Sequence, residues 1–232
     1  MYKHLVMVGL LLVASGSASA QISSEFPKLE ASPDFMYIHN TTNLGNFFYV
    51  SQPITTPVQL TGKNSFNCAG GGGTVTYNLR SYLGIAMDLD GCKFFGDTLG
   101  LGNTASGNQF TYLFGPRVTF RTPSRFVPFF LLEFGGDRVS LSCNNSGNNC
   151  STVSGSHSIS RNVFAMTVGG GFDWRINRRF SVRPIDAEYL YTNFGNGCVS
   201  TTTTPTCGSN NHQNAFRMKS GVVFAFGGSA SK

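Results

Sequence analysis

The ionisable residues of this chain have types and spacing that favour charge neutralisation over catalysis. Six acidic and six basic side chains fall, mostly at alternating positions, within stretches that otherwise hold apolar and small residues. They are Asp88, Asp90, Glu133, Asp173, Asp186 and Glu188, and Arg117, Arg121, Arg175, Arg183, Arg217 and Lys219. Buried charges must be paired and hydrogen-bonded, or each costs several kcal/mol. The equal numbers predict an interior network of ion pairs.

Nucleophiles and metal-ligating residues are not arranged for an enzymatic reaction. Nucleophilic catalysis needs a nucleophile beside a base. His157 lies near Ser156 and Ser158, but in a Gly- and Ser-rich stretch where a histidine is usually just solvated. The four histidines are far apart, and no Cys-x-x-Cys motif supports zinc. We therefore expect no catalytic residue, no metal and no cofactor, and we expect that the protein is not an enzyme.

The elements that must carry the charges have a period of two. Near the end of the chain, Phe216, Met218 and Phe224 fall on one face of an extended segment, and Arg217 and Lys219 fall on the other. Successive side chains of a β-strand point to opposite faces, so this pattern predicts a strand. Aromatic residues on one face and charges on the other are typical of a membrane β-barrel, with lipid outside and a polar lumen inside.

Eight such strands are expected, joined by short turns and long loops in strict alternation. The strands lie near 34–42, 66–78, 82–94, 109–121, 126–141, 162–176, 180–193 and 213–227. The short connections are Leu79 to Ser81, Thr122 to Arg125 and Asn177 to Arg179; the long ones are 43–65, 95–108, 142–161 and 194–212. Outer-membrane barrels have this asymmetry, with short turns in the periplasm and long loops outside the cell.

The seventh strand fits the two-residue period less well than the others. Arg183 has one parity, while Asp186 and Glu188 share the other. A β-bulge near Pro184 would place all three side chains inside. Without a bulge, some charge faces lipid, which costs about 2–4 kcal/mol for Arg or Lys at the bilayer midplane.

The six cysteines predict structural disulfides. Cys143 and Cys150 bracket a short polar stretch, as do Cys198 and Cys207, and each pair is expected to close a small loop. A hairpin that turns about Arg80 places Cys68 directly opposite Cys92, which predicts a cross-strand disulfide. In the alternative, the four glycines at 70–73 contain a bulge and this match is accidental.

Composition and the N-terminus point to export. Only 12% of the residues are charged and 13% are aromatic, too few charges for an ordinary soluble surface, where about 25% is typical. The basic residues are scattered, so no nucleic-acid partner is expected. Residues 1–20 are expected to be a signal peptide, with Lys3 at its basic start and cleavage after Ala18-Ser19-Ala20. A segment at 21–33, a barrel at 34–227 and a tail at 228–232 would follow.

Several short motifs resemble those of the OmpA-like transmembrane domain, within the family of small bacterial outer-membrane β-barrel proteins. They are Phe114-Gly115-Pro116-Arg117-Val118, residues 128–136, residues 168–173, Val182-Arg183-Pro184 with Glu188-Tyr189, and residues 221–227. The resemblance implies an all-β, eight-stranded, antiparallel up-and-down barrel in the bacterial outer membrane. It also implies outer-membrane lipid and lipopolysaccharide as surroundings, the outer-membrane assembly machinery as a partner during insertion, and a monomer. The family's last strand usually carries a terminal aromatic insertion signal, whereas six residues follow Phe226 here.

Several functional interpretations remain open. The leading one is a structural or adhesive anchor that displays stapled surface loops, with slight passive permeability and no ligand named by the loop sequences. Within it, the lumen charges either plug the barrel or form a gated ion path in which Glu133 switches between Arg partners. The alternative is a secreted, lipocalin-like barrel that carries an apolar ligand, with its aromatic residues inside and its charges outside.

Overall fold

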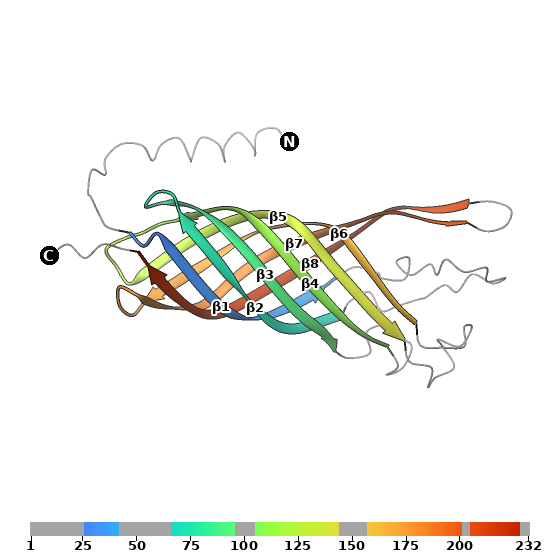
Figure 1. The fold of residues 1–232 in the computed structure, drawn as a ribbon, viewed down its shortest axis with the longest axis horizontal. Helices are drawn as coiled ribbons and strands as arrows, with labels where there is room; N and C mark the ends of the chain where they lie inside the picture. Colours follow the sequence, from blue (N-terminus) through green and yellow to red (C-terminus); the bar gives the residue numbers. More distant parts are fainter. Residues whose placement is uncertain (1–25, 42–65, 96–104, 144–156, 201–204, 228–232) are drawn as a thin grey trace.

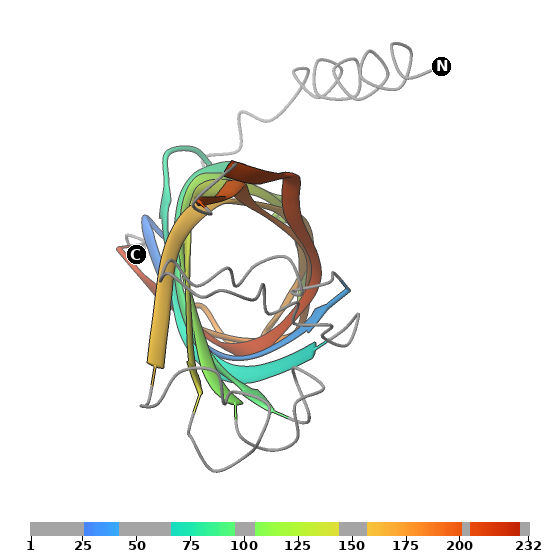
Figure 2. The ribbon, with the colours of Figure 1, turned by 90° about the vertical axis from the view of Figure 1, so that its right-hand side faces the viewer.

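The chain forms a closed barrel of eight antiparallel strands in a computed structural model that describes residues 26–41, 66–95, 105–143, 157–200 and 205–227. The strands pair in sequence order, and β1 closes the barrel by pairing with β8. The bounds are β1 Leu29–Asn40, β2 Phe66–Asn78, β3 Leu83–Phe95, β4 Ala105–Thr119, β5 Phe126–Cys143, β6 His157–Arg175, β7 Phe180–Ser200 and β8 Pro205–Phe226. Among the described residues, no helix has the length and hydrophobicity needed to span a membrane. Figure 2 shows the strands as a closed ring.

The outer surface of the barrel is apolar and its lumen holds the charges. On β4, the side chains of Phe110, Tyr112 and Phe114 are exposed, and 63% of Phe114 is accessible. Arg117 of the same strand has the opposite parity and is only 1% exposed. The same division holds on β8, where Phe216 points outward and Arg217 is buried. A soluble barrel with an apolar lumen needs the opposite arrangement, so the lipocalin-like interpretation is wrong.

The two ends of the barrel differ, as the lengths of the connections predict. Three short turns lie at the end where β1 begins and β8 finishes (Figure 1). One of them is held by Asn177, whose side-chain oxygen accepts hydrogen bonds from the backbone N–H groups of Arg179 and Phe180, each at 2.8 Å. An Asn side chain that bonds the backbone two residues on is a recurrent way to fix a tight turn.

Several strands extend further than the sequence predicts. β1 begins at Leu29 rather than at residue 34, and the predicted loop at 194–212 is largely a paired hairpin of β7 and β8 that reaches Ser200 and Pro205. Alternating aromatic residues mark only the part of a strand that faces lipid. Backbone pairing between strands continues past that part, through segments rich in Ser, Thr, Asn and Gly. Residues 1–25, with the expected signal peptide, lie outside the described residues.

The irregularity of the seventh strand is a bulge at Pro184. The register between β7 and β8 shifts between Arg183 and Asp186. As a result Arg183, Asp186 and Glu188 are all buried, each at 1% exposure or less. The bulge corrects the parity of the strand and keeps three charges out of the lipid.

Cys68 and Cys92 form a disulfide between β2 and β3, with Cα atoms 5.6 Å apart. The register that led to this expectation is wrong by two residues, because Gly70 rather than Cys68 lies opposite Cys92. The turn at 79–82 is longer than a hairpin centred on Arg80. A Cβ on Gly70 would lie 2.8 Å from the Cβ of Cys92, so the glycine leaves the space through which Cys92 reaches diagonally to Cys68.

We predict that Cys68→Ser lowers the stability of the folded barrel by about 3 kcal/mol, the entropic effect expected for a loop of this size. The bond closes a sequence separation of 24 residues. Urea titration of the folded band on unboiled gels measures the change. Peptide mapping without reductant should join the Cys68 and Cys92 peptides, and a Cys68 peptide joined to any other cysteine would contradict this pairing.

We also predict that Gly115→Ala prevents the close approach of β4 and β5. Its Cβ would lie 2.0 Å from the backbone oxygen of Leu132 and 2.8 Å from the Cα of Glu133. Overpacking of this kind costs at least about 1–3 kcal/mol, which the same urea titration detects. Gly91→Ala is the matched control, because its Cβ meets only Phe110 at 3.5 Å. Equal stability of the two variants would show that strand spacing is not limiting.

Candidate functional site in the barrel lumen

The centre of the lumen is a network of ion pairs around Arg217 of β8. Its guanidinium donates to Asp88 and Asp90 of β3 at 2.9 Å each, and its Nε donates to Glu188 of β7 at 2.9 Å. Lys219 contacts Asp88 and lies 3.0 Å from a Glu188 oxygen. All five side chains have 0% side-chain exposure. The closing strand β8 thus supplies the cations for Glu188 on the adjacent strand β7 and for two acids across the lumen on β3.

A second group of ion pairs lies nearer the short turns. Asp173 of β6 accepts hydrogen bonds at 2.8 Å from both Arg117 of β4 and Arg183 of β7. The two guanidinium groups also lie over the ring of Phe129, at 4.0 and 4.5 Å from its centroid. At that distance a cation is attracted to the ring face, which helps to hold two like charges together.

Glu30 and Arg121 close this end of the lumen. Arg121 donates to a Glu30 oxygen at 2.7 Å, and Asn78 donates to the same oxygen at 3.2 Å. Arg121 also donates to the backbone oxygen of Ser81 in the first turn. These bonds tie the beginning of β1 to the first short turn at this end of the barrel.

Apolar side chains fill the lumen on the loop side of the ion pairs. On β7 the order is Glu188, Leu190, Thr192, and both Leu190 and Thr192 are buried. On β1 Met36 and Ile38 follow Asp34 in the same direction. The apolar cluster consists of Met36, Ile38, Cys68, Cys92, Leu113, Ala165, Leu190 and Ala215.

A small polar group lies beyond the apolar cluster. Gln109 donates to Asp137 at 2.6 Å, and Thr192 donates to the same carboxylate oxygen at 3.3 Å. Gln213 donates to the side chain of Asn40. The lumen is therefore layered, with ion pairs, apolar packing and amide hydrogen bonds in succession.

The lumen residues expected from sequence are mostly brought together, with two exceptions. Arg175 is half-buried near a turn and makes no ion pair with a described carboxylate. Glu133 is fully buried, but neither of its oxygens has a described hydrogen-bond partner. No described arginine forms an ion pair with Glu133, the residue that the gating hypothesis expects to switch between Arg partners.

Three further acids lie in the lumen: Glu30, Asp34 and Asp137. Asp137 has the parity of Glu133 on β5, so alternation along that strand would have found it. Glu30 and Asp34 share the inward parity of β1, but the expected start at residue 34 left this strand without a face assignment. Of the remaining cysteines, Cys150 lies outside the described residues, and Cys198 and Cys207 are directly opposite in the ladder of β7 and β8.

Neisserial surface protein A has a similar fold, and two other solved structures resemble the chain with lower scores. Neisserial surface protein A has 13% identity and a TM-score of 0.52, with 86% of this chain and 97% of that chain covered. The outer membrane protein OprG from Pseudomonas aeruginosa has 13% identity, a TM-score of 0.48 and coverages of 87% and 97%. Ail of Yersinia pestis has 16% identity, a TM-score of 0.43 and coverages of 84% and 98%. A comparison with curated proteins finds no match.

The family comparison covers nearly the whole chain. The model of the outer membrane protein beta-barrel domain matches residues 8–223. Together with the lipid-facing aromatic surface, this match locates the chain in the bacterial outer membrane. The chain belongs to the family of outer membrane proteins with this β-barrel domain.

Proposed function

We propose that the protein is a non-conducting anchor in the outer membrane that holds loops at the cell surface for structural or adhesive contacts. The observation that carries the proposal is the filled lumen. Arg217, Glu188 and Leu190 are buried at 1% exposure or less in the middle of the barrel. An eight-stranded barrel is just wide enough for side chains to fill, so such packing leaves no path for solute.

The apolar cluster is the strongest argument for a plug over a gated path. Ion pairs can exchange partners, but the apolar side chains of Met36, Ile38 and Leu113 offer no polar atom to replace the water around a passing ion. Slight permeability would require these side chains to move apart. The ion pairs then serve to neutralise lumen charge, and the proposal includes no enzymatic activity.

The loop end supports a display role. A strand that crosses a membrane needs about 9–11 residues, whereas β7 has 21 and β8 has 22. Their hairpin projects beyond the rest of the barrel (Figure 1). Because Cys198 and Cys207 are paired residues of that hairpin, we propose that a disulfide staples it, and a second staple from Cys143 to Cys150 remains part of the proposal.

We predict that the wild-type protein and Glu133→Ala both give no conductance steps in planar lipid bilayers. Truncating Glu133 leaves the apolar cluster in place, so the plug should hold. A purified large porin in the same bilayers is the positive control. Discrete steps in the wild-type recording, abolished or altered by Glu133→Ala, would overturn the plug and favour the gated path.

For surface display, we predict that an epitope tag inserted between Ser200 and Pro205 is labelled by antibody on intact cells. The same tag inserted at Ser124 in a short turn should be labelled only after the cells are permeabilised. Cells whose long loops are shortened should adhere less to surfaces and to each other than cells with the wild-type barrel. If the tag at Ser124 is labelled on intact cells, the proposed orientation of the barrel is wrong. If shortening the loops leaves adherence unchanged, the proposed adhesive role is wrong.

A further inference from the structure

The acids and bases of this protein are sorted between the inside and the rims of the barrel. The chain has 11 Asp and Glu and a formal net charge of +6. All nine acids in the described residues face the lumen, eight of them buried and Asp34 half-buried. The basic side chains buried with them, among the described residues, are Arg117, Arg183, Arg217 and Lys219, and Arg121 lies at the edge. The lumen of a basic protein therefore holds an excess of acid.

Several of these carboxylates lack a partner among the described residues. Neither oxygen of Asp34, Glu133 or Asp186 accepts a hydrogen bond, and Oδ1 of Asp90 is also without a donor. Asp186 lies 3.7 Å from the guanidinium of Arg183, and the other oxygen of Asp90 pairs with Arg217, whereas Asp34 and Glu133 form no ion pair within 4 Å among the described residues. A buried carboxylate without compensation is strongly unfavourable, so it must take up a proton or a cation.

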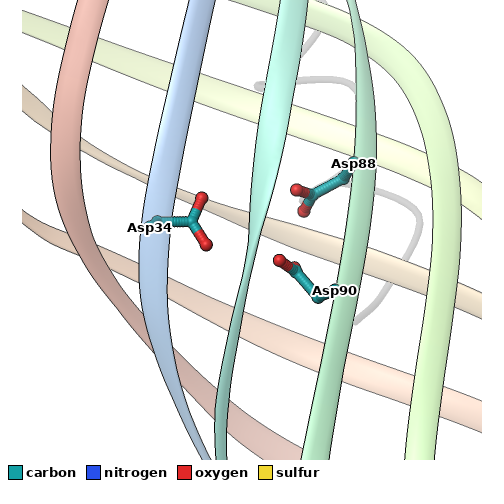
Figure 3. A group of neighbouring side chains, drawn as sticks. All are labelled: Asp34, Asp88 and Asp90. Atoms are coloured by element: carbon teal, nitrogen blue, oxygen red, sulfur yellow. The ribbon is translucent and has the colours of Figure 1, made fainter.

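Three of the acids converge on one point of the lumen. One oxygen each from Asp34 of β1 and from Asp88 and Asp90 of β3 lie within 4.8 Å of one another. Figure 3 shows their carboxyl groups pointing toward one another across β2. Repulsion between like charges opposes this arrangement unless something positive lies between them.

A glycine creates the space in which the carboxylates meet. Gly72 of β2 is paired with Asp34 on one side and with Asp90 on the other. A Cβ on Gly72 would lie 2.1 Å from Oδ1 of Asp90, the buried oxygen without a partner. That oxygen therefore points into the gap above Gly72, toward Asp34. Gly221 of β8 flanks Asp34 on its other side.

We propose that Asp34, Asp88 and Asp90 form a binding site for a hard divalent cation of the Ca²⁺ class. Carboxylate oxygens are the ligands that such cations prefer, and Ca²⁺ takes 6–8 of them. Four of the oxygens of the three carboxylates are contacted by neither Lys219 nor Arg217 and can serve as ligands. The cation would lie above Gly72, between Asp34 and the free oxygen of Asp90. Lys219 contacts the other oxygens of Asp88 and Asp90, so it neutralises the opposite side of the cluster.

The surrounding charges favour a cation in addition to Lys219. Glu133 is fully buried on β5 and lies close enough to interact electrostatically with Asp88 and Glu188 as well as with Lys219 and Arg217. Around the cluster, acids thus outnumber the cations that the chain supplies. A proton shared between Asp34 and Asp90 is the competing way to relieve the repulsion, and the experiment separates the two.

The test is calorimetric titration of the folded, EDTA-treated protein with CaCl₂ in a zwitterionic detergent free of lipopolysaccharide. The wild type should bind a single Ca²⁺, with affinity in the roughly 0.1–1 mM range of extracellular calcium modules or tighter. Asp34→Asn should weaken binding by about tenfold or more, since affinity depends on the number of charged ligands. Gly72→Ala fills the gap and should weaken it similarly.

Asp137→Asn is the matched control, because Asp137 is a buried acid whose carboxylate bonds Gln109 and Thr192 outside the cluster. It should bind Ca²⁺ as the wild type does. A second readout uses the thermal unfolding of the barrel: Ca²⁺ should raise the melting temperature of the wild type and leave that of Asp34→Asn unchanged. In EDTA, Asp34→Asn should melt above the wild type because one repelling charge is gone.

The outcomes decide between cation and proton. No heat of binding and no thermal shift with up to millimolar Ca²⁺ would overturn the proposal and leave the shared proton. Binding that survives Asp34→Asn unchanged would place the cation elsewhere and overturn it as well. If Gly72→Ala does not fold, Asp34→Asn, which keeps the size of the side chain, still decides the question.

Discussion

The exclusion of charge from lipid is the constraint on which the rest of this structure depends. Each Arg or Lys moved to the lipid face costs about 2–4 kcal/mol at the bilayer midplane. The barrel therefore gathers its membrane-level charges in a narrow lumen, where they must satisfy one another. Arg217 shows this most clearly, because it forms ion pairs with three carboxylates at once, those of Asp88, Asp90 and Glu188. The bulge at Pro184 also keeps charge out of lipid, because the shift in register turns Asp186 and Glu188 toward the lumen.

The narrowness of the lumen explains the glycines as much as the charges. Large side chains such as Arg117 and Arg217 occupy the interior, so other positions that face the lumen must be small. Gly115, Gly169 and Gly171 face the lumen where a Cβ would lie within 2.0–2.4 Å of a backbone oxygen on the next strand. Glycine at these positions keeps adjacent backbones close, and the missing side chains leave room for guanidinium groups.

The sequence predicted the parts of the structure that obey the two-residue period and missed those that do not. The aromatic face of β8, the inward Arg117 and the eight-strand count all follow from alternation. The register between β2 and β3 did not follow from alternation. The four glycines at 70–73 have no side chains that would assign the faces of β2, and the register derived from the expected turn was wrong by two residues. Glu30 was missed because the first strand was expected to begin at residue 34, and Asp34 was missed because no face was assigned to that strand. Glu188 lies directly opposite Arg217 in the hairpin of β7 and β8, but Asp88 and Asp90 lie on β3, and only the closed barrel brings them to Arg217.

Closure of the barrel completes the neutralisation of the acids on β3. Before β8 docks against β1, Asp88 and Asp90 have no cation on the strands adjacent to β3 except Arg117, which pairs with Asp173. Arg217 and Lys219 reach them from more than a hundred residues away in sequence. An open sheet in the membrane would leave these carboxylates uncompensated as well as leaving strand edges unpaired, which lipid does not tolerate. A barrel that has not closed is therefore unfavourable in two ways: the carboxylates of Asp88 and Asp90 lack Arg217 and Lys219, and the edges of β1 and β8 lack hydrogen bonds.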